Sequence, residues 1–157
     1  KLEFKVLIAP ELRQSSCLSD VGRVKQILLN LISNSYKFTF KGGITLAVSA
    51  CNRFDDIFLQ NNRYIKFTVE DSGIGIAKQD IKQLFKMFGT IKKHREMYNS
   101  KGTGLGLTIA KKLTESLGGS IEIRSREGEG TLAQFTVRDW TVGDGLDEGT
   151  PDRIAIT

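Results

Sequence analysis

Two asparagines stand four positions apart in a segment whose apolar residues recur at helical spacing, from Val21 to Phe38. Asn30 and Asn34 therefore project from one side of the expected helix, and Lys37 follows on that side. Asparagine is a poor helix former, whereas an ordinary solvated helix face favours Lys, Glu and Gln. An amide oxygen is a hard, neutral ligand that suits Mg²⁺, and a lysine ammonium group suits phosphate oxygens. The spacing indicates a site for Mg²⁺ and phosphate; the alternative is a polar helix face with incidental asparagines.

A second candidate is the run Asp71-Ser72-Gly73-Ile74-Gly75, which directly follows a strand-like apolar segment. A carboxylate can only accept hydrogen bonds, so at a pocket floor Asp71 would bind an exocyclic amine such as that of adenine. The two glycines would let the backbone approach a flat ring closely. A plain turn after a strand has the same composition, so the run alone does not separate the two interpretations.

The third candidate is a glycine-rich run at the start of a predicted helix, Lys101-Gly102-Thr103-Gly104-Leu105-Gly106. Backbone N–H groups exposed at a helix N-terminus can form a cradle for phosphate. The chain contains no Gly-Lys dipeptide, so a P-loop is absent from the sequence. The glycine spacing also differs from the GxGxxG of a Rossmann unit.

The elements that must position these residues follow from periodicity and turn residues. Strands are predicted over 2–9, 44–50, 64–69, 120–125 and 131–137. Helices are predicted from an N-cap at Ser19 or Asp20 to about Thr39, over 77–85 and over 105–117. This order implies an α+β fold, a two-layer α/β sandwich in which helices cover one face of one mixed sheet. Residues 86–103 lack clear periodicity, and such a long connection inside a compact domain is usually functional or mobile.

The net charge of +5 is unevenly distributed over the 157 residues. Residues 139–157, interpreted as an acidic tail or linker, hold five carboxylates and one arginine, a net charge of −4 that leaves +9 on the predicted domain 1–138. Such a surplus suits a polyanion, either nucleotide phosphates or nucleic acid. The phenylalanines fall mostly at apolar-periodic positions rather than between basic residues, which argues against nucleic acid as a partner.

Cysteine and hydropathy patterns limit the class of protein further. Cys17 and Cys51 form no CxxC pair, so we interpret them as free thiols in a reducing cytosol; the alternative is a disulfide between them. No apolar run approaches the roughly 20 residues that a membrane-spanning helix needs, and no signal peptide is recognisable. We expect a domain cut from a longer cytoplasmic protein, or from the cytosolic part of a membrane-anchored receptor.

Taken in order, the segments resemble the sequence boxes of the GHKL (Bergerat-fold) ATPase superfamily, and within it the catalytic, ATP-binding domain of histidine kinases. The N box is Asp20-x-x-Arg23-x-x-Gln26-Ile-Leu-Leu-Asn30-Leu-Ile-Ser-Asn34-Ser-Tyr-Lys37-Phe38-Thr39, the G1 box Asp71-Ser-Gly-Ile-Gly75-Ile76, the F box Leu84-Phe85-Lys-Met-Phe88 and the G2 box Gly102-Thr-Gly-Leu-Gly106-Leu. The resemblance covers residues 2–137, and it implies a flexible ATP lid over 86–103.

The resemblance also implies roles for single residues. Asn34 would bind Mg²⁺, Asn30 would lie near the phosphates, and Lys37 would contact phosphate, so Asn30 and Lys37 are the candidate catalytic residues. Asp71 would bind the adenine amine and Phe38 would lie against the ring. The other residues expected to line the ATP site are Gly73, Gly75, Ile76, Lys101, Gly102, Thr103, Gly104, Leu105 and Gly106.

By this resemblance, the domain would bind Mg-ATP and donate its γ-phosphoryl group to a histidine on a separate dimerisation domain of the same protein. The resemblance also implies a downstream response-regulator receiver domain as a partner, and a full-length protein that is a homodimer. The alternatives are a GHKL ATPase that hydrolyses ATP and a non-enzymatic ATP-binding module.

Three positions depart from the family pattern. Asn30 stands where the ATP-hydrolysing members, such as gyrase B and MutL, have a glutamate base, which favours a kinase. Ser35 and Tyr36 replace the usual pair of small apolar residues, and the usual Leu-Pro after the final strand is missing. The single histidine, His94, lacks the sequence context of a phosphorylated histidine, so we interpret it as a solvated lid residue.

Overall fold

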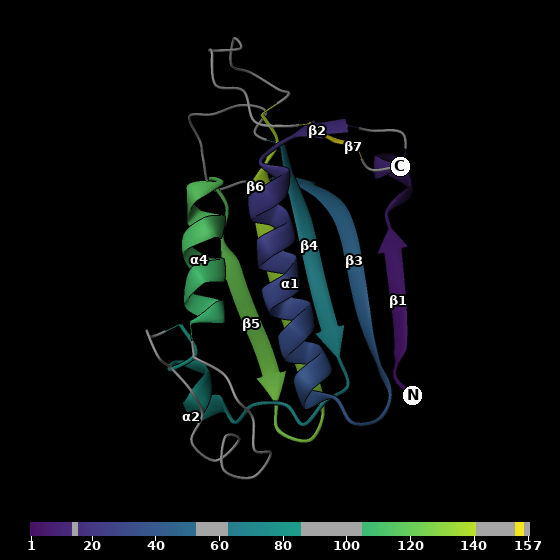
Figure 1. Cartoon of the computed structure of the whole chain (residues 1–157), viewed down its shortest axis with the longest axis vertical. Helices are drawn as coiled ribbons and strands as arrows, with labels where there is room; N and C mark the ends of the chain where they lie inside the picture. Colours follow the sequence, from purple (N-terminus) through teal and green to yellow (C-terminus); the bar gives the residue numbers. More distant parts are fainter. Residues whose placement is uncertain (14–15, 53–62, 86–104, 141–152, 156–157) are drawn as a thin grey trace.

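Five strands form one mixed sheet, in the order β1-β3-β4-β6-β5, in the computed structural model, which describes residues 1–13, 16–52, 63–85, 105–140 and 153–155 (Figure 1). The strands are β1 (Glu3–Ile8), β3 (Gly43–Asn52), β4 (Arg63–Asp71), β5 (Ile121–Arg126) and β6 (Gly130–Arg138). β1 runs parallel to β3, and every other neighbouring pair is antiparallel. Parallel strands need a crossover connection, and helix α1 (Val21–Phe38) lies in the one between β1 and β3.

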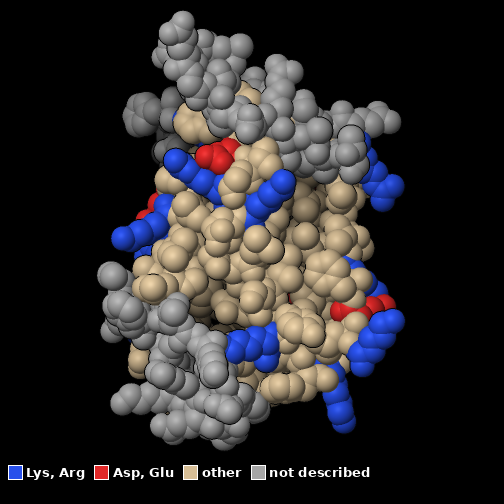
Figure 2. Space-filling model, viewed as in Figure 1, with Lys and Arg blue, Asp and Glu red and all other residues tan. Residues whose placement is uncertain are grey.

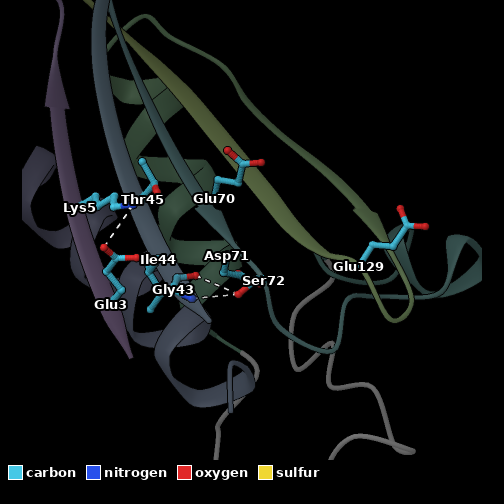
Figure 3. A pocket seen from close by; sticks show the side chains of 9 residues that line it. All are labelled: Glu3, Lys5, Gly43, Ile44, Thr45, Glu70, Asp71, Ser72 and Glu129. Atoms are coloured by element: carbon cyan, nitrogen blue, oxygen red, sulfur yellow. Dashed lines mark hydrogen bonds and ion pairs between the residues drawn. The ribbon is translucent and has the colours of Figure 1, made fainter. Parts of the chain in front are cut away.

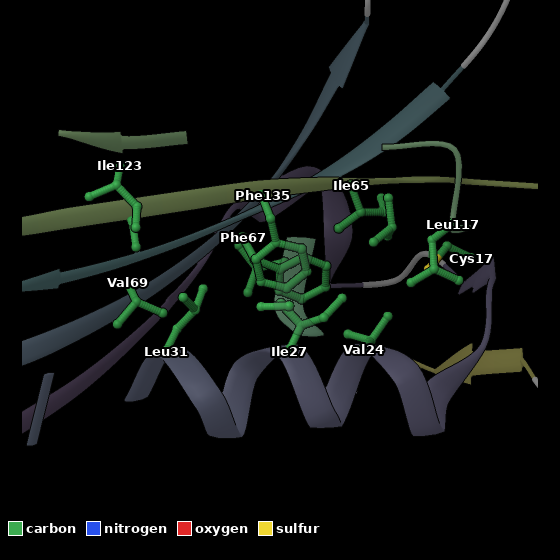
Figure 4. Packing of buried hydrophobic residues seen from close by; sticks show 14 of the residues in the cluster. Cys17, Val24, Ile27, Leu31, Ile65, Phe67, Val69, Leu117, Ile123 and Phe135 are labelled. Carbon is green, nitrogen blue, oxygen red and sulfur yellow. The ribbon is translucent and has the colours of Figure 1, made fainter. Parts of the chain in front are cut away.

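The central strands bury alternate residues, as period-two patterning requires. On β4 the buried residues include Ile65, Phe67 and Val69. Phe67 pairs with Phe135 of β6, and the two rings stack with their centroids 4.8 Å apart (Figure 4). These side chains form the sheet side of a core that α1 closes from the other side.

Helices α1 and α4 (Gly106–Ser116) lie on the same face of the sheet (Figure 1). The Asp20 side chain accepts a hydrogen bond of 2.9 Å from the Arg23 N–H, so Asp20, one of the two predicted candidates, is the N-cap of α1. From α1, Val24, Ile27 and Leu31 point into the core (Figure 4). The predicted two-layer α+β sandwich is confirmed. No helix in the described part of the chain is both long and apolar enough to span a membrane.

Helix α2 (Lys78–Ile81) is shorter than the predicted helix over 77–85. The N–H groups of Gln83 and Leu84 bond to the carbonyl groups of Asp80 and Ile81, three residues back. This i→i+3 pattern tightens the chain into turns and ends the α-helix.

One end of the molecule holds elements that the sequence did not predict: the 3₁₀ turn η1 (Pro10–Leu12) and a two-stranded sheet of β2 (Ser16–Leu18) and β7 (Arg153–Ala155). β7 lies within the segment interpreted as a tail. Asp139 is buried, its N–H donates to Arg63 O, and its Oδ1 accepts from the Leu18 N–H. Contacts with the body thus continue beyond residue 138, while the domain boundary itself stays a prediction.

Candidate nucleotide-binding site

Asp71 ends β4 in the middle of the sheet, paired with Ile44 of β3 on one side and Thr131 of β6 on the other. Its Oδ1 accepts hydrogen bonds from the N–H groups of Gly73 (3.0 Å) and Thr131 (3.2 Å). Its Oδ2 accepts from the Ser35 hydroxyl (2.7 Å) on α1. Only 9% of Asp71 is exposed, so its carboxylate is a nearly buried acceptor held from both layers.

The glycine run after Asp71 lies directly against the end of α1. The Ile74 N–H donates to the Phe38 carbonyl oxygen (3.0 Å), and a Cβ atom at Gly73 would come 2.5 Å from that same oxygen. Further along, the Ile76 N–H donates to the Ser125 hydroxyl (2.8 Å) on β5. Backbone contacts therefore fix the loop between α1 and the β5–β6 hairpin, and no side chain larger than hydrogen fits at Gly73.

The polar side of α1 faces α4. A Cβ atom at Gly106 would lie 3.5 Å from the Asn30 Oδ1 atom, so the first turn of α4 abuts Asn30. At the other end of this contact, Arg23 donates to the Ser116 hydroxyl (3.1 Å). The Asn30 Nδ2 atom is buried and has no hydrogen-bond partner within the described part of the chain. An unpaired, buried donor is costly unless a ligand accepts from it.

Lys37 and Phe38 lie together at the C-terminal end of α1, both half-buried. The Lys37 Nζ atom is 5.3 Å from the centroid of the Phe38 ring, within range of a cation–π contact. The two residues predicted to contact phosphate and adenine therefore touch each other. On this helix-covered face the visible charged side chains are mostly Lys and Arg (Figure 2), which suits an anionic ligand.

A hollow of about 290 Å³ lies on the other side of Asp71 (Figure 3). Its lining includes the carboxylates of Glu3, Glu70 and Glu129, and Glu3 forms an ion pair with Lys5 (3.2 Å). Glu70 precedes Asp71 in the strand, so its side chain points away from the helices. Three carboxylates would repel phosphate, and we therefore place the nucleotide site on the helix face.

Residues 19–141 match the family model for histidine kinase-, DNA gyrase B- and HSP90-like ATPases. The chain belongs to this ATP-binding family. The GHKL class inferred from the four sequence boxes is confirmed, and so is its fold.

Relatives of the domain include a histidine kinase and a sensor protein. It is 44% identical over 121 residues to hybrid signal transduction histidine kinase B of Dictyostelium discoideum, covering 75% of this chain and 6% of the relative. It is 34% identical over 131 residues to the aerobic respiration control sensor protein ArcB of Escherichia coli strain K12, covering 83% of this chain and 16% of the relative. The GHKL domain thus spans less than a fifth of the length of these relatives.

Two solved structures share the fold. Full-length ShkA in complex with AMPPNP superimposes with a TM-score of 0.67 at 28% identity, covering 88% of this chain and 26% of that one. The mycobacterial sensor histidine kinase MprB gives a TM-score of 0.64 at 19% identity, covering 88% of this chain and 82% of that one, and this second likeness concerns the fold alone.

Within the GHKL domain, the described residues that were predicted for the site lie along the C-terminal half of α1 and in the segments beside it. Asn30 lies beside Gly106, and Asp71, Gly73 and Gly75 lie in or next to the loop under Phe38. Leu105 immediately precedes α4. Lys101, Gly102, Thr103, Gly104, His94 and the predicted lid over 86–103 lie outside the described residues. The individual roles assigned to the site residues stay predictions.

The donor set is compatible with Mg²⁺ held largely by a triphosphate and water. Asn34, half-buried on the α4 side of α1, offers one neutral amide oxygen, and Mg²⁺ usually takes few protein ligands beside substrate phosphates. The unpaired Asn30 Nδ2 is a donor, so it suits a phosphate oxygen and not a metal ion.

Sequence reasoning missed two residues of the site. Ser35 donates to the Asp71 carboxylate, and Thr39 has a buried hydroxyl without a partner in the described residues, beside Gly73. Ser35 did stand out as a departure from the family pattern, but the sequence alone gave no partner for its hydroxyl.

Proposed function

We propose that this domain binds Mg-ATP and donates its γ-phosphoryl group to a histidine on a separate dimerisation domain of the same protein. The observation that carries the proposal is the Asp71 carboxylate, held by three donors and facing the helix layer. Such a group accepts a hydrogen bond from the exocyclic amine of adenine. The phosphates would then extend toward Asn30 and the first turn of α4, which adjoin each other.

Transfer is favoured over hydrolysis by the chemistry of Asn30. A neutral amide cannot take a proton, so Asn30 cannot activate a water molecule as a glutamate would. It can instead donate its unpaired Nδ2–H group to a phosphate oxygen. Phosphoryl transfer depends mainly on positioning and charge neutralisation, and Lys37 would add a positive charge for the phosphates.

Asn34 would hold Mg²⁺ through its amide oxygen. When bound, Mg²⁺ would supply charge neutralisation of the triphosphate. The acceptor histidine and the phosphate relay to a response-regulator receiver domain belong to the rest of the protein, which we propose to be a homodimer whose kinase region is cytoplasmic. The names of the relatives, a hybrid signal transduction kinase and sensor proteins, support this placement in a signalling protein.

The experiment uses ATP labelled in the γ-phosphate, with the domain alone and with the histidine-bearing domain of the same protein added in trans. We expect no label on the isolated domain, whose single histidine is His94. The added domain should acquire an acid-labile label, because phosphohistidine is a phosphoramidate. Rapid ATP hydrolysis by the domain alone would favour the hydrolysing branch of the family. Acid-stable label on its own Ser or Thr would contradict transfer to histidine.

A further inference from the structure

Ser35 behaves unlike the other hydroxyl residues in the helices for which hydrogen bonds are resolved. In α4 the hydroxyl of Thr114 donates to Ala110 O, and that of Ser116 donates to Leu113 O, both within their own helix. Ser35 is buried, with 6% of its surface exposed, and its hydroxyl instead crosses to the sheet and donates to Asp71 Oδ2 at 2.7 Å. This contact joins two residues that the sequence places on separate elements.

The hydrogen bonds around Asp71 leave little freedom for its carboxylate. A carboxylate has about four acceptor positions, two on each oxygen. On Oδ1 two positions are taken by the N–H groups of Gly73 and Thr131. On Oδ2 one is taken by Ser35, so a single position remains for a ligand. Within the described part of the chain, the Ser35 hydroxyl is the one partner of Oδ2.

We propose that Ser35 is a positioning residue that determines base selectivity by aiming the remaining acceptor of Asp71 at the exocyclic amine of adenine. This rests on the proposed binding of ATP. The Ser35 oxygen has given its only proton to Asp71, so it too can only accept. The pair of Ser35 and Asp71 therefore presents only acceptors to a ligand. It fits an amine at position 6 of a purine and repels the carbonyl oxygen of a 6-oxopurine.

A purely packing role for Ser35 makes a different prediction. A buried side chain that only fills space can be replaced by alanine, which is nearly the same size, without a change that depends on the base. The hydroxyl matters only if the ligand contacts the group that it holds. The two roles are therefore separated by comparing nucleotides with and without the 6-amino group.

The test is the substitution Ser35→Ala, with dissociation constants measured by calorimetry for ATP and for purine riboside triphosphate, which lacks the amine. We expect ATP binding to weaken about ten-fold, since hydrogen bonds that involve a charged group are among the stronger ones. Binding of the analogue should not change. Ser33→Ala, an exposed serine on the same helix, is the matched control and should leave both constants unchanged. Unfolding midpoints check that each variant is folded.

A second arm places Ser35→Ala in an Asp71→Asn background. If Ser35 acts through Asp71, the second substitution adds no further change in the ratio of the two dissociation constants. If Ser35→Ala leaves the ratio of the dissociation constants for ATP and analogue unchanged, the positioning role is overturned while the proposed binding of ATP stands. Failure of the unsubstituted domain to prefer ATP over the analogue would overturn the contact between Asp71 and the amine, and failure to bind either nucleotide would instead overturn the proposed function.

Discussion

A Cβ atom at Gly75 would lie 1.9 Å from the carbonyl oxygen of Arg126, so the backbone of the loop after β4 rests directly on the turn between β5 and β6. Gly75 has a φ of +65°, a conformation that residues with a side chain rarely adopt. The N–H of Gly128 in the same turn donates to Ile74 O at 2.7 Å. The loop that carries the expected adenine site therefore contacts the β5–β6 hairpin as well as α1.

Gly75→Ala should destabilise the domain by about 3 kcal/mol or more, because strain at positive φ and a backbone collision act together. Gly128→Ala is the matched control. Gly128 also has a positive φ, +83°, but a Cβ atom there would have no neighbour within 4 Å. Only the conformational penalty of about 1–2 kcal/mol should remain. Urea unfolding measures the free energy of unfolding of both variants. Equal decreases would show that the collision with Arg126 is relieved at little cost.

Asp71→Asn should weaken ATP binding about 10- to 100-fold and remove the preference for ATP over GTP, since the amide loses the charge and turns a donor toward a donor. The neighbouring Glu70→Gln provides the control, because Glu70 is exposed and points to the opposite face. The dissociation constants of both variants for ATP and for GTP are measured by calorimetric titration. If the variant still binds ATP tightly and prefers it to GTP, Asp71 is only a turn residue and does not bind adenine.

Asn34→Ala should weaken binding of ATP in the presence of Mg²⁺ more than in EDTA, because the adenine contacts around Asp71 remain. A several-fold gap between the two conditions is expected for loss of one of few protein ligands. Dissociation constants are compared with and without Mg²⁺. The same loss in both conditions would mean that Asn34 contacts the nucleotide and not the metal ion.

Burial, reinforced by the negative charge of Asp139, raises the pKa of Cys17 from about 9 to about 11. The unfolded chain therefore loses this proton first as pH rises, and the folded state binds more protons between these values. The contribution of Cys17 to stability should be complete below pH 9 and decline as pH approaches 11. We expect the difference in unfolding free energy between the unsubstituted domain and Cys17→Ala to fall over this range. If this difference in unfolding free energy stays constant between pH 9 and pH 11, the raised pKa of Cys17 is contradicted.

Long periodic segments were predictable from the sequence because local pattern determines them. The helix that follows Asp20 and the alternating strands around Phe67 have one face that must be buried. By contrast, β2 and β7 are three-residue strands far apart in the chain, and their pairing depends on the position of both in the finished fold. No period can be read from three residues.

The candidate site also has a part that the sequence predicts and a part that depends on the folded structure. The types and spacing of Asn30, Asn34 and Asp71 are compatible with nucleotide chemistry but also with a polar helix face and a plain turn, so the prediction needed the order of the four sequence boxes as well. Which donors hold Asp71 depends on how α1 crosses β4 and on the register of β6, and neither is encoded locally. A hydroxyl in a helix usually bonds to its own backbone, so the Ser35 contact follows only from the tertiary arrangement of α1 and β4.

Asp71 pairs with Thr131, so residues 72–130 form one excursion of the chain between two neighbouring positions of the sheet. This excursion carries α2, α4, β5 and much of the expected ATP site. The entropy of closing such a loop changes slowly with its length, by only about 0.2 kcal/mol for ten residues more or less. Insertions and deletions within 86–104 therefore leave the pairing of the two central strands almost unaffected. The segment 86–104 can therefore be lengthened, shortened or exchanged while β4 and β6 stay paired.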